Sequence, residues 1–93
     1  MLRSLYKSVI LGIIKSNSNS YSLKLYKNTE LLRRKIIEES YELISESLKC
    51  KVIKERIIEE SCDLIYHITV YLISFGIRYC CILKELKKRK KPD

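Results

Sequence analysis

Two matched acidic clusters lie in the middle of the sequence. The segment IIEES occurs at 36–40 and again at 57–61, and the likeness extends over KIIEESYELISE (35–46) and RIIEESCDLIYH (56–67). Carboxylates that crowd together at neutral pH repel one another unless a cation neutralises them. A doubled cluster is therefore a candidate metal site, and oxygen ligands favour a hard divalent cation, Mg²⁺ first and Mn²⁺ as the alternative.

The spacing predicts that these carboxylates share two helical strips. At 100° per residue, the strips hold Glu39 and Glu42 on one helix, and Glu60 and Asp63 on the other. If the two helices form a hairpin that turns near residue 50, the four carboxylates lie level, roughly 14 Å from the turn at 1.5 Å per residue. The same pairing brings Glu46 level with Arg56. Metal-assisted chemistry on a phosphate ester or anhydride would suit such a site.

A structural alternative must be weighed against the metal site. Glu-rich helices often carry a solvated face with salt bridges one turn apart, and Lys35–Glu39 and Arg56–Glu60 have that spacing. Two copies that come level in a hairpin, each beside an apolar stripe, favour the metal site.

The elements that position the clusters are all predicted to be helical. We expect a single all-α domain over 1–93, with an N-terminal helix and loop (1–19), a short helix from Ser20 to Tyr26, long helices at 29–48 and 52–74, a last helix at 78–90 and a basic tail (87–93). Asn28 is expected to end the short helix in a left-handed conformation, and Thr29 to cap the next one. Gly76 is expected to end the second long helix.

The charge distribution favours a polyanionic small substrate. The 93 residues carry a net charge of +8, yet residues 1–29 contain no acid and the carboxylates gather in the centre. A positive rim around an acidic centre would steer such a substrate toward a metal. A basic helical protein that binds nucleic acid is a more remote alternative, because no helix carries a long unbroken basic stripe. We expect no nucleic-acid partner.

The chain is expected to be cytoplasmic, without a membrane partner. The longest apolar run (64–75) is too short to span a bilayer, and no clear targeting segment is present. The four cysteines form no C-x-x-C pair, which predicts buried, reduced thiols.

At this point the motifs resemble a known superfamily. EESYE (38–42) followed by EESCDLIYH (59–67) is similar to the E-E-x-x-E … E-x-x-D signature of the all-α nucleoside triphosphate pyrophosphohydrolases. Within it, the chain resembles the phosphoribosyl-ATP pyrophosphohydrolase family. SYSLKLYKN (20–28) resembles the S-Y-T-x-x-L-x-x-G segment of that family, and DLIYH (63–67) with ELKKR (85–89) resembles its D-L-L-Y-H and terminal L-x-x-R.

Two departures from the family pattern are chemically mild. Ser22 stands where the family usually has Thr, so a hydroxyl remains. Asn28 stands where it has Gly, and Asn tolerates positive φ.

The resemblance implies hydrolysis of phosphoribosyl-ATP between its α and β phosphates, the second step of histidine biosynthesis. It implies that the four strip carboxylates hold Mg²⁺. Glu38 and Glu59 lie about 100° off the strips, and they become candidates for supporting the metal ligands from outside or for a base that orients the attacking water. Candidates for phosphate binding are Lys35 and, less directly, Lys24, Lys27, Arg34 and, from a partner subunit, Arg89. A general nucleoside triphosphate pyrophosphohydrolase is the alternative, since it would share the metal site.

The remaining expectations concern His67 and the assembly. His67 could be a ligand or an acid–base group, but a His within an apolar helix is more often a hydrogen-bonded core residue, which we favour. The second long helix is apolar over a wide arc, with Ile58, Ile65 and Leu72 on one side and Ile57, Leu64 and Phe75 on another. This predicts a homodimer with sites near the subunit interface, as in the family. Association with phosphoribosyl-AMP cyclohydrolase, which performs the next step, is left open.

Overall fold

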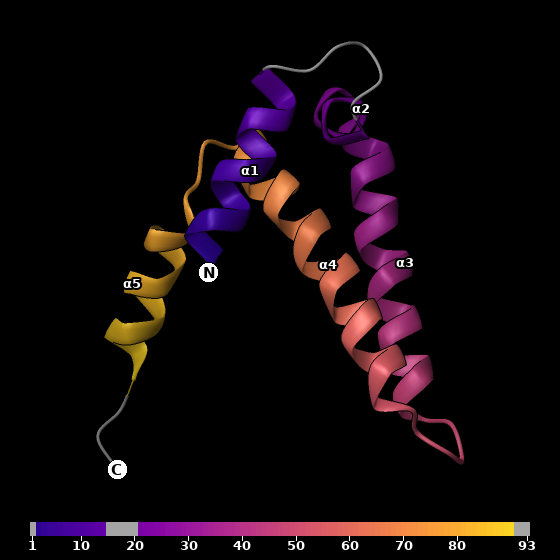
Figure 1. The fold of residues 1–93 in the computed structure, drawn as a ribbon. Coiled ribbons are helices and arrows are strands. Elements are labelled where there is room, and N and C mark those ends of the chain that lie inside the picture. The colour runs from indigo at the N-terminus through magenta and orange to yellow at the C-terminus, as the bar shows by residue number, and fades with distance from the viewer. Residues whose placement is uncertain (1, 15–20, 91–93) are drawn as a thin grey trace.

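The fold is entirely helical in the part of the chain that the computed structural model describes, residues 2–14 and 21–90. Its elements are α1 (Leu2–Ile14), α2 (Tyr21–Lys27), α3 (Thr29–Ser47), α4 (Lys54–Ser74) and α5 (Tyr79–Arg89) (Figure 1). This confirms the all-α prediction. The predicted loop at 16–20 and the Ser20 cap lie outside the described residues.

An antiparallel hairpin of α3 and α4 is the main feature of the fold, and the two helices run side by side from the turn at 48–53 (Figure 1). A small core lies toward the open end of the hairpin, where α1 and α2 pack against it. Its buried apolar side chains are Val9, Leu25, Leu32 and Val70, one from each of the first four helices. Partly buried residues such as Tyr66 and Ile36 surround this core. The predicted hairpin with flanking helices is therefore present.

The start of α3 differs from the prediction. Asn28 has φ −124° and ψ 82°, and its side chain accepts a hydrogen bond from the Leu31 amide at 3.1 Å. Asn28 is thus the N-cap, and both the left-handed Asn28 and the Thr29 cap were wrong. The physical reason is that the Asn28 carboxamide satisfies an otherwise unpaired amide of the first turn, which requires a non-helical backbone at Asn28 itself.

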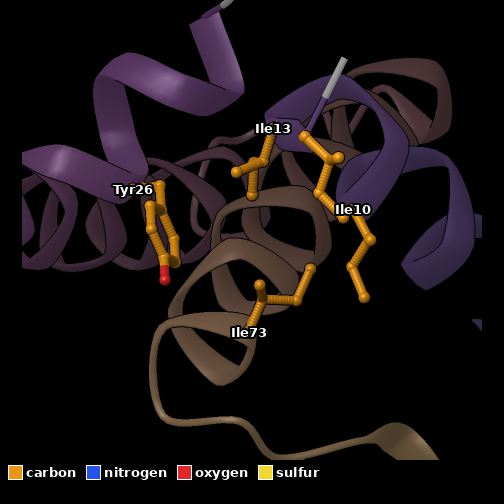
Figure 2. Close-up of a pocket in the computed structure, with 5 residues that line it drawn as sticks. Ile10, Ile13, Tyr26 and Ile73 are labelled. Carbon is orange, nitrogen blue, oxygen red and sulfur yellow. The ribbon is translucent and has the colours of Figure 1, made fainter. Parts of the chain in front are cut away.

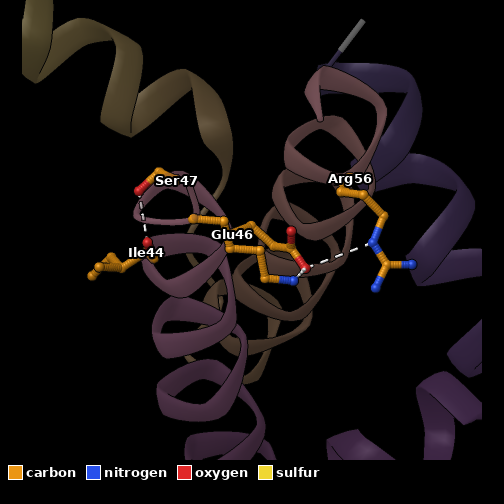
Figure 3. Close-up of polar contacts among 5 residues, drawn as sticks. Ile44, Glu46, Ser47 and Arg56 are labelled. Carbon is orange, nitrogen blue, oxygen red and sulfur yellow. Dashed lines mark hydrogen bonds and ion pairs between the residues drawn. The ribbon is translucent and has the colours of Figure 1, made fainter. Parts of the chain in front are cut away.

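The turn of the hairpin is longer than predicted. Ile53 is extended, with φ −105° and ψ 110°, so α4 begins at Lys54 rather than Val52. Near the turn, Glu46 Oε1 lies 2.8 Å from Lys49 Nζ and 3.6 Å from Arg56 Nε (Figure 3). Glu46 and Arg56 are therefore level across the hairpin, as predicted. At the other end of α4, Gly76 has φ 69° and ends the helix as expected.

Helix α5 leaves the hairpin at a sharp angle and lies beside α1 (Figure 1). Within the described residues, no single helix has the length and apolar character needed to cross a membrane; α4 and α5 would meet that test only jointly, across a bend of 104°.

The cysteines are free, as predicted, but all four are exposed. Their predicted burial is wrong. Cys50 lies in the turn, Cys62 lies on an exposed part of α4, and the remaining two lie on α5, which has no buried residue.

Candidate metal centre

Three carboxylates converge between the two helices of the hairpin. Glu39 and Glu42 come from α3 and Glu60 comes from α4, and each offers an oxygen that lies within 4.8 Å of the others. Glu39 is buried, while Glu42 and Glu60 are half-buried. The second Glu of each IIEES copy thus meets the other across the hairpin, since antiparallel packing places the copies at the same height.

The cluster contains polar atoms without a partner. Oε2 of Glu39 and Oε2 of Glu60 are buried and accept no hydrogen bond within the described residues. Buried carboxylate oxygens are normally paired, because burial removes their water. A hard cation would satisfy both atoms, and the oxygen-only donor set fits Mg²⁺ or Mn²⁺.

The proton affinity of the cluster reflects first its burial and then its crowding. The pKa of Glu60 is raised to about 7, first by loss of water and then by a hydrogen bond with Glu42 and the charges of Glu42 and Glu39. The pKa of Glu39 is also raised, first by burial and then by the charges of Glu42 and Asp63. Without a cation, the cluster therefore tends to retain protons at neutral pH.

Asp63 occupies the next turn of α4 and is exposed. Its oxygens are not among the three that converge, although its charge acts on Glu39.

The salt bridges expected under the structural alternative do not form among the described residues. Lys35 lies 3.9 Å from Glu38, not from Glu39. Arg56 pairs with Glu46, and no cation pairs with Glu60 within residues 2–14 and 21–90. Among residues 2–14 and 21–90, the carboxylates that converge therefore have no neutralising side chain in hydrogen-bonding contact.

The other predicted site residues are half-buried or exposed. Lys35 is half-buried one turn before Glu39. Those that are exposed are Glu38, Glu59, Lys24, Lys27 and Arg34. Arg89 is exposed on α5 and lies 3.4 Å from Glu85 within its own helix.

His67 is a buried, hydrogen-bonded residue, as predicted, with 5% of its surface exposed. Its Nδ1 lies 2.7 Å from the Asp63 carbonyl oxygen, and its Nε2 lies 3.0 Å from the Tyr21 hydroxyl. Sequence reasoning gave Tyr21 no role. A signal that could have pointed to Tyr21 is the SYS segment (20–22). That segment resembles the S-Y-T of the family, but the resemblance alone assigned no role to its tyrosine.

Two surface cavities are lined by residues other than those of the cluster. One, of about 180 Å³, lies between α1, α2 and α4 (Figure 2) and is lined by Ile10, Ile13, Ile14, Tyr26 and Ile73. A larger one, of about 400 Å³, lies between α1 and α5 and includes Arg3, Lys7 and Arg78. The apolar lining of the first excludes it as a site for a highly charged ligand.

The fold and the site define an all-α protein whose central helical hairpin carries a shared carboxylate centre. The profile of phosphoribosyl-ATP pyrophosphohydrolase matches residues 2–90. The chain belongs to the phosphoribosyl-ATP pyrophosphohydrolase family.

Individual relatives agree with the family match. A protein named phosphoribosyl-ATP pyrophosphatase from Pyrobaculum aerophilum is 38% identical over 80 residues, which cover 85% of this chain and 83% of the relative. One of the same name from Saccharolobus islandicus strain M.16.27 is 39% identical over 88 residues, covering 94% and 92%. The histidine biosynthesis bifunctional protein HisIE of Buchnera aphidicola is 38% identical over 76 residues, which cover 81% of this chain and 36% of that protein. No solved structure gives a significant match.

Proposed function

We propose that this chain hydrolyses phosphoribosyl-ATP to phosphoribosyl-AMP and pyrophosphate, a step of histidine biosynthesis, in the cytoplasm. The observation that carries the proposal is the convergence of Glu39, Glu42 and Glu60 with buried oxygens that lack partners, in a member of this family. The names of two relatives state the same activity.

Glu39, Glu42 and Glu60 would hold a divalent cation, Mg²⁺ or Mn²⁺, with Asp63 as a further ligand. When bound, such a cation polarises phosphoryl oxygens and lowers the pKa of a coordinated water. The protein supplies fixed ligands: Glu39 Oε2 and Glu60 Oε2 are already buried and unpaired in the hairpin. Ligands held this way need little rearrangement when the cation binds.

The predicted basic site residues would bind the phosphates. Lys35 is half-buried one turn from Glu39, so its ammonium is suited to a phosphate that shares the cation. The exposed Lys24, Lys27 and Arg34 would attract the polyanion, and Arg89 would reach a phosphate in the partner subunit. Glu38 and Glu59 each precede a ligand in the chain, and we assign them to orienting or deprotonating the attacking water.

We also propose that the chain forms a homodimer. Exposed apolar side chains follow one stripe of α3 and its C-cap: Ile37 (70% exposed), Tyr41 (72%), Ile44 (58%) and the cap residue Leu48 (78%). On α4, Ile58 and Ile65 are exposed as well. Contiguous apolar surface of this kind marks an interface. Association with a phosphoribosyl-AMP cyclohydrolase is supported by the bifunctional relative, of which this chain matches only a part.

Pyrophosphate release tests the proposal. We expect the purified chain to release pyrophosphate from phosphoribosyl-ATP when Mg²⁺ is present, and to stop when a chelator removes it. Ordinary nucleoside triphosphates serve as the comparison. A preference for them would favour the general pyrophosphohydrolase, and no release from any of these substrates would overturn the proposal.

A further inference from the structure

The first residue of α2 is hydrogen-bonded to α4, the helix that carries Glu60 of the acidic cluster. The Tyr21 hydroxyl lies 3.0 Å from Nε2 of His67, and the two rings meet edge to face with centroids 6.0 Å apart. On its other side, His67 Nδ1 lies 2.7 Å from the backbone oxygen of Asp63. A chain of contacts thus runs from α2 to the backbone of a proposed metal ligand.

The direction of both hydrogen bonds follows from their chemistry. The Asp63 carbonyl can only accept, so His67 Nδ1 carries a hydrogen and donates it. In the neutral imidazole, Nε2 then bears a lone pair and accepts from the Tyr21 hydroxyl. The Tyr21 proton is therefore committed to His67, and the hydroxyl oxygen can only accept from any further partner.

A second link fixes the position of α2. The Ser22 and Tyr66 hydroxyls are hydrogen-bonded at 2.5 Å, and the Tyr21 and Tyr66 rings are stacked with an interplanar angle of 13°. A helix of seven residues is marginal by itself, so tertiary contacts must hold it in place. Leu25, which is fully buried, anchors the same helix in the core. Tyr21 is thus held in one place relative to α4.

The surroundings of Tyr21 combine access with negative charge. The side chain is 48% exposed, so a ligand can reach it. It lies within the electrostatic range of Lys35, Glu39 and Asp63. An acceptor oxygen on which two carboxylate charges act disfavours phosphate oxygens and favours a hydrogen-bond donor, whereas Lys35 favours phosphate.

We propose that Tyr21 is a specificity-determining residue whose hydroxyl oxygen, oriented by His67, accepts a hydrogen bond from a hydroxyl of the sugar that carries the triphosphate. The inference rests on the proposed function. If cleavage occurs between the α and β phosphates, the ribose attached to the α phosphate is the neutral, donor-bearing part of the substrate nearest the cation. Its hydroxyls match an acceptor on which the charges of Glu39 and Asp63 act.

Discrimination between ribose and deoxyribose substrates tests the assignment. We would measure kcat/KM for phosphoribosyl-ATP and for two counterparts, in which the ribose that carries the triphosphate lacks its 2′-hydroxyl or its 3′-hydroxyl. One hydrogen bond predicts that the wild type disfavours one deoxy substrate by about 3- to 10-fold. Tyr21→Phe should reduce that ratio to near one. Since both rates come from the same preparation, a loss of folded protein cancels in the ratio.

Tyr26→Phe is the matched control. Tyr26 lies on the same helix at 40% exposure, faces the apolar cavity (Figure 2), and its hydroxyl makes no hydrogen bond within the described residues. It should keep the wild-type ratio. A wild type that does not discriminate, or a Tyr21→Phe variant that still does, overturns the inference while pyrophosphate release stands. No release from any substrate would instead count against the proposed function.

Two substitutions of His67 test its orienting role. His67→Gln places an acceptor near the position of Nε2 and should keep most of the discrimination. His67→Asn is too short to reach Tyr21, which frees the hydroxyl proton, so discrimination should fall toward that of Tyr21→Phe. Equal ratios for the Gln and Asn variants would contradict an orienting role of His67.

Discussion

Glu46 of α3 and Arg56 of α4 join the two helices near the turn of the hairpin, with 3.6 Å between Oε1 and Nε (Figure 3). Glu46 also lies 2.8 Å from Lys49, and only 10% of its side chain is exposed. This pairing belongs to the same register in which Glu39 and Glu42 meet Glu60.

Loss of the Glu46 carboxylate should destabilise the hairpin. We expect Glu46→Gln to lower the thermal midpoint, because the variant leaves a largely buried side chain with weaker partners. The control is Glu85→Gln, which removes an exposed pair with Arg89 at 3.4 Å and should change the midpoint little. Equal midpoints for the two variants, measured by circular dichroism, would show that the Glu46 pairing does not stabilise the hairpin.

The metal-free protein should lose stability as pH rises. The folded pKa of Glu60 is about 7, above its ordinary value of 4.5, so the folded state holds the proton more tightly than the unfolded state. The free energy of unfolding therefore falls between about pH 4.5 and 7. Thermal midpoints at pH 5 and pH 8 would test this, and Glu60→Gln should flatten the dependence. A midpoint that rises over this range would contradict the prediction.

At lower pH, the lowered pKa of Glu46 should make the protein less stable as pH falls. The pKa of Glu46 is lowered chiefly by the hydrogen bond with Lys49. Its stabilising contribution is therefore present above the unfolded pKa and lost as pH falls through the folded pKa. Stability at acidic pH should be less pH-dependent in Glu46→Gln than in the wild type, which thermal midpoints below pH 5 would show. If the thermal midpoint of the variant depends on pH below 5 as that of the wild type does, Glu46 is not the source of this dependence.

Cation affinity should depend on carboxylates from both helices. We expect Glu39→Gln, Glu42→Gln and Glu60→Gln each to weaken Mg²⁺ binding by at least about tenfold, since even groups outside the ligand shell have effects of that size. Glu55→Gln, at the exposed start of α4, is the control. Titration calorimetry measures each affinity. Normal binding by Glu39→Gln would remove that residue from the ligand set.

Much of the hairpin was predictable from the sequence. The register followed from the repeated acidic motif, because antiparallel helices with matched strips must place the copies level. This argument anticipated both the Glu46–Arg56 pairing and the meeting of Glu39 with Glu60. The cap at Asn28 was not predicted, because Asn suits both a left-handed helix end and an N-cap, and the sequence alone does not decide between them.

The hydrogen bond between Tyr21 and His67 could not be predicted from the sequence, for a different reason. It joins residues 46 positions apart. Helical periodicity indicates which face a residue occupies, but it does not show which side chain of another element comes within hydrogen-bonding distance. The exposure of the four cysteines was missed similarly, since composition gives no information on which helix faces remain uncovered.

The exposed apolar stripe of α3 predicts that the chain forms a homodimer through this helix. Ile44→Glu places a charge at the centre of the stripe and should convert a homodimer to a monomer, because burial of an unpaired carboxylate is unfavourable. Ser4→Glu adds the same charge at an exposed position of α1 and should leave the dimer intact. Sedimentation velocity distinguishes the 11.1 kDa chain from its dimer. A wild type that sediments as a monomer would contradict the proposed dimer.

The most direct test of the central claim is pyrophosphate release from phosphoribosyl-ATP by Glu39→Gln, Glu60→Gln and the double variant, with Mg²⁺ and with Glu55→Gln as the control. If one site is shared between the two helices, each single substitution lowers kcat/KM by about 100-fold or more, and the double variant is hardly worse than either single one. Wild-type activity in either single variant would contradict a shared site. Strictly multiplicative losses in the double variant would also contradict it.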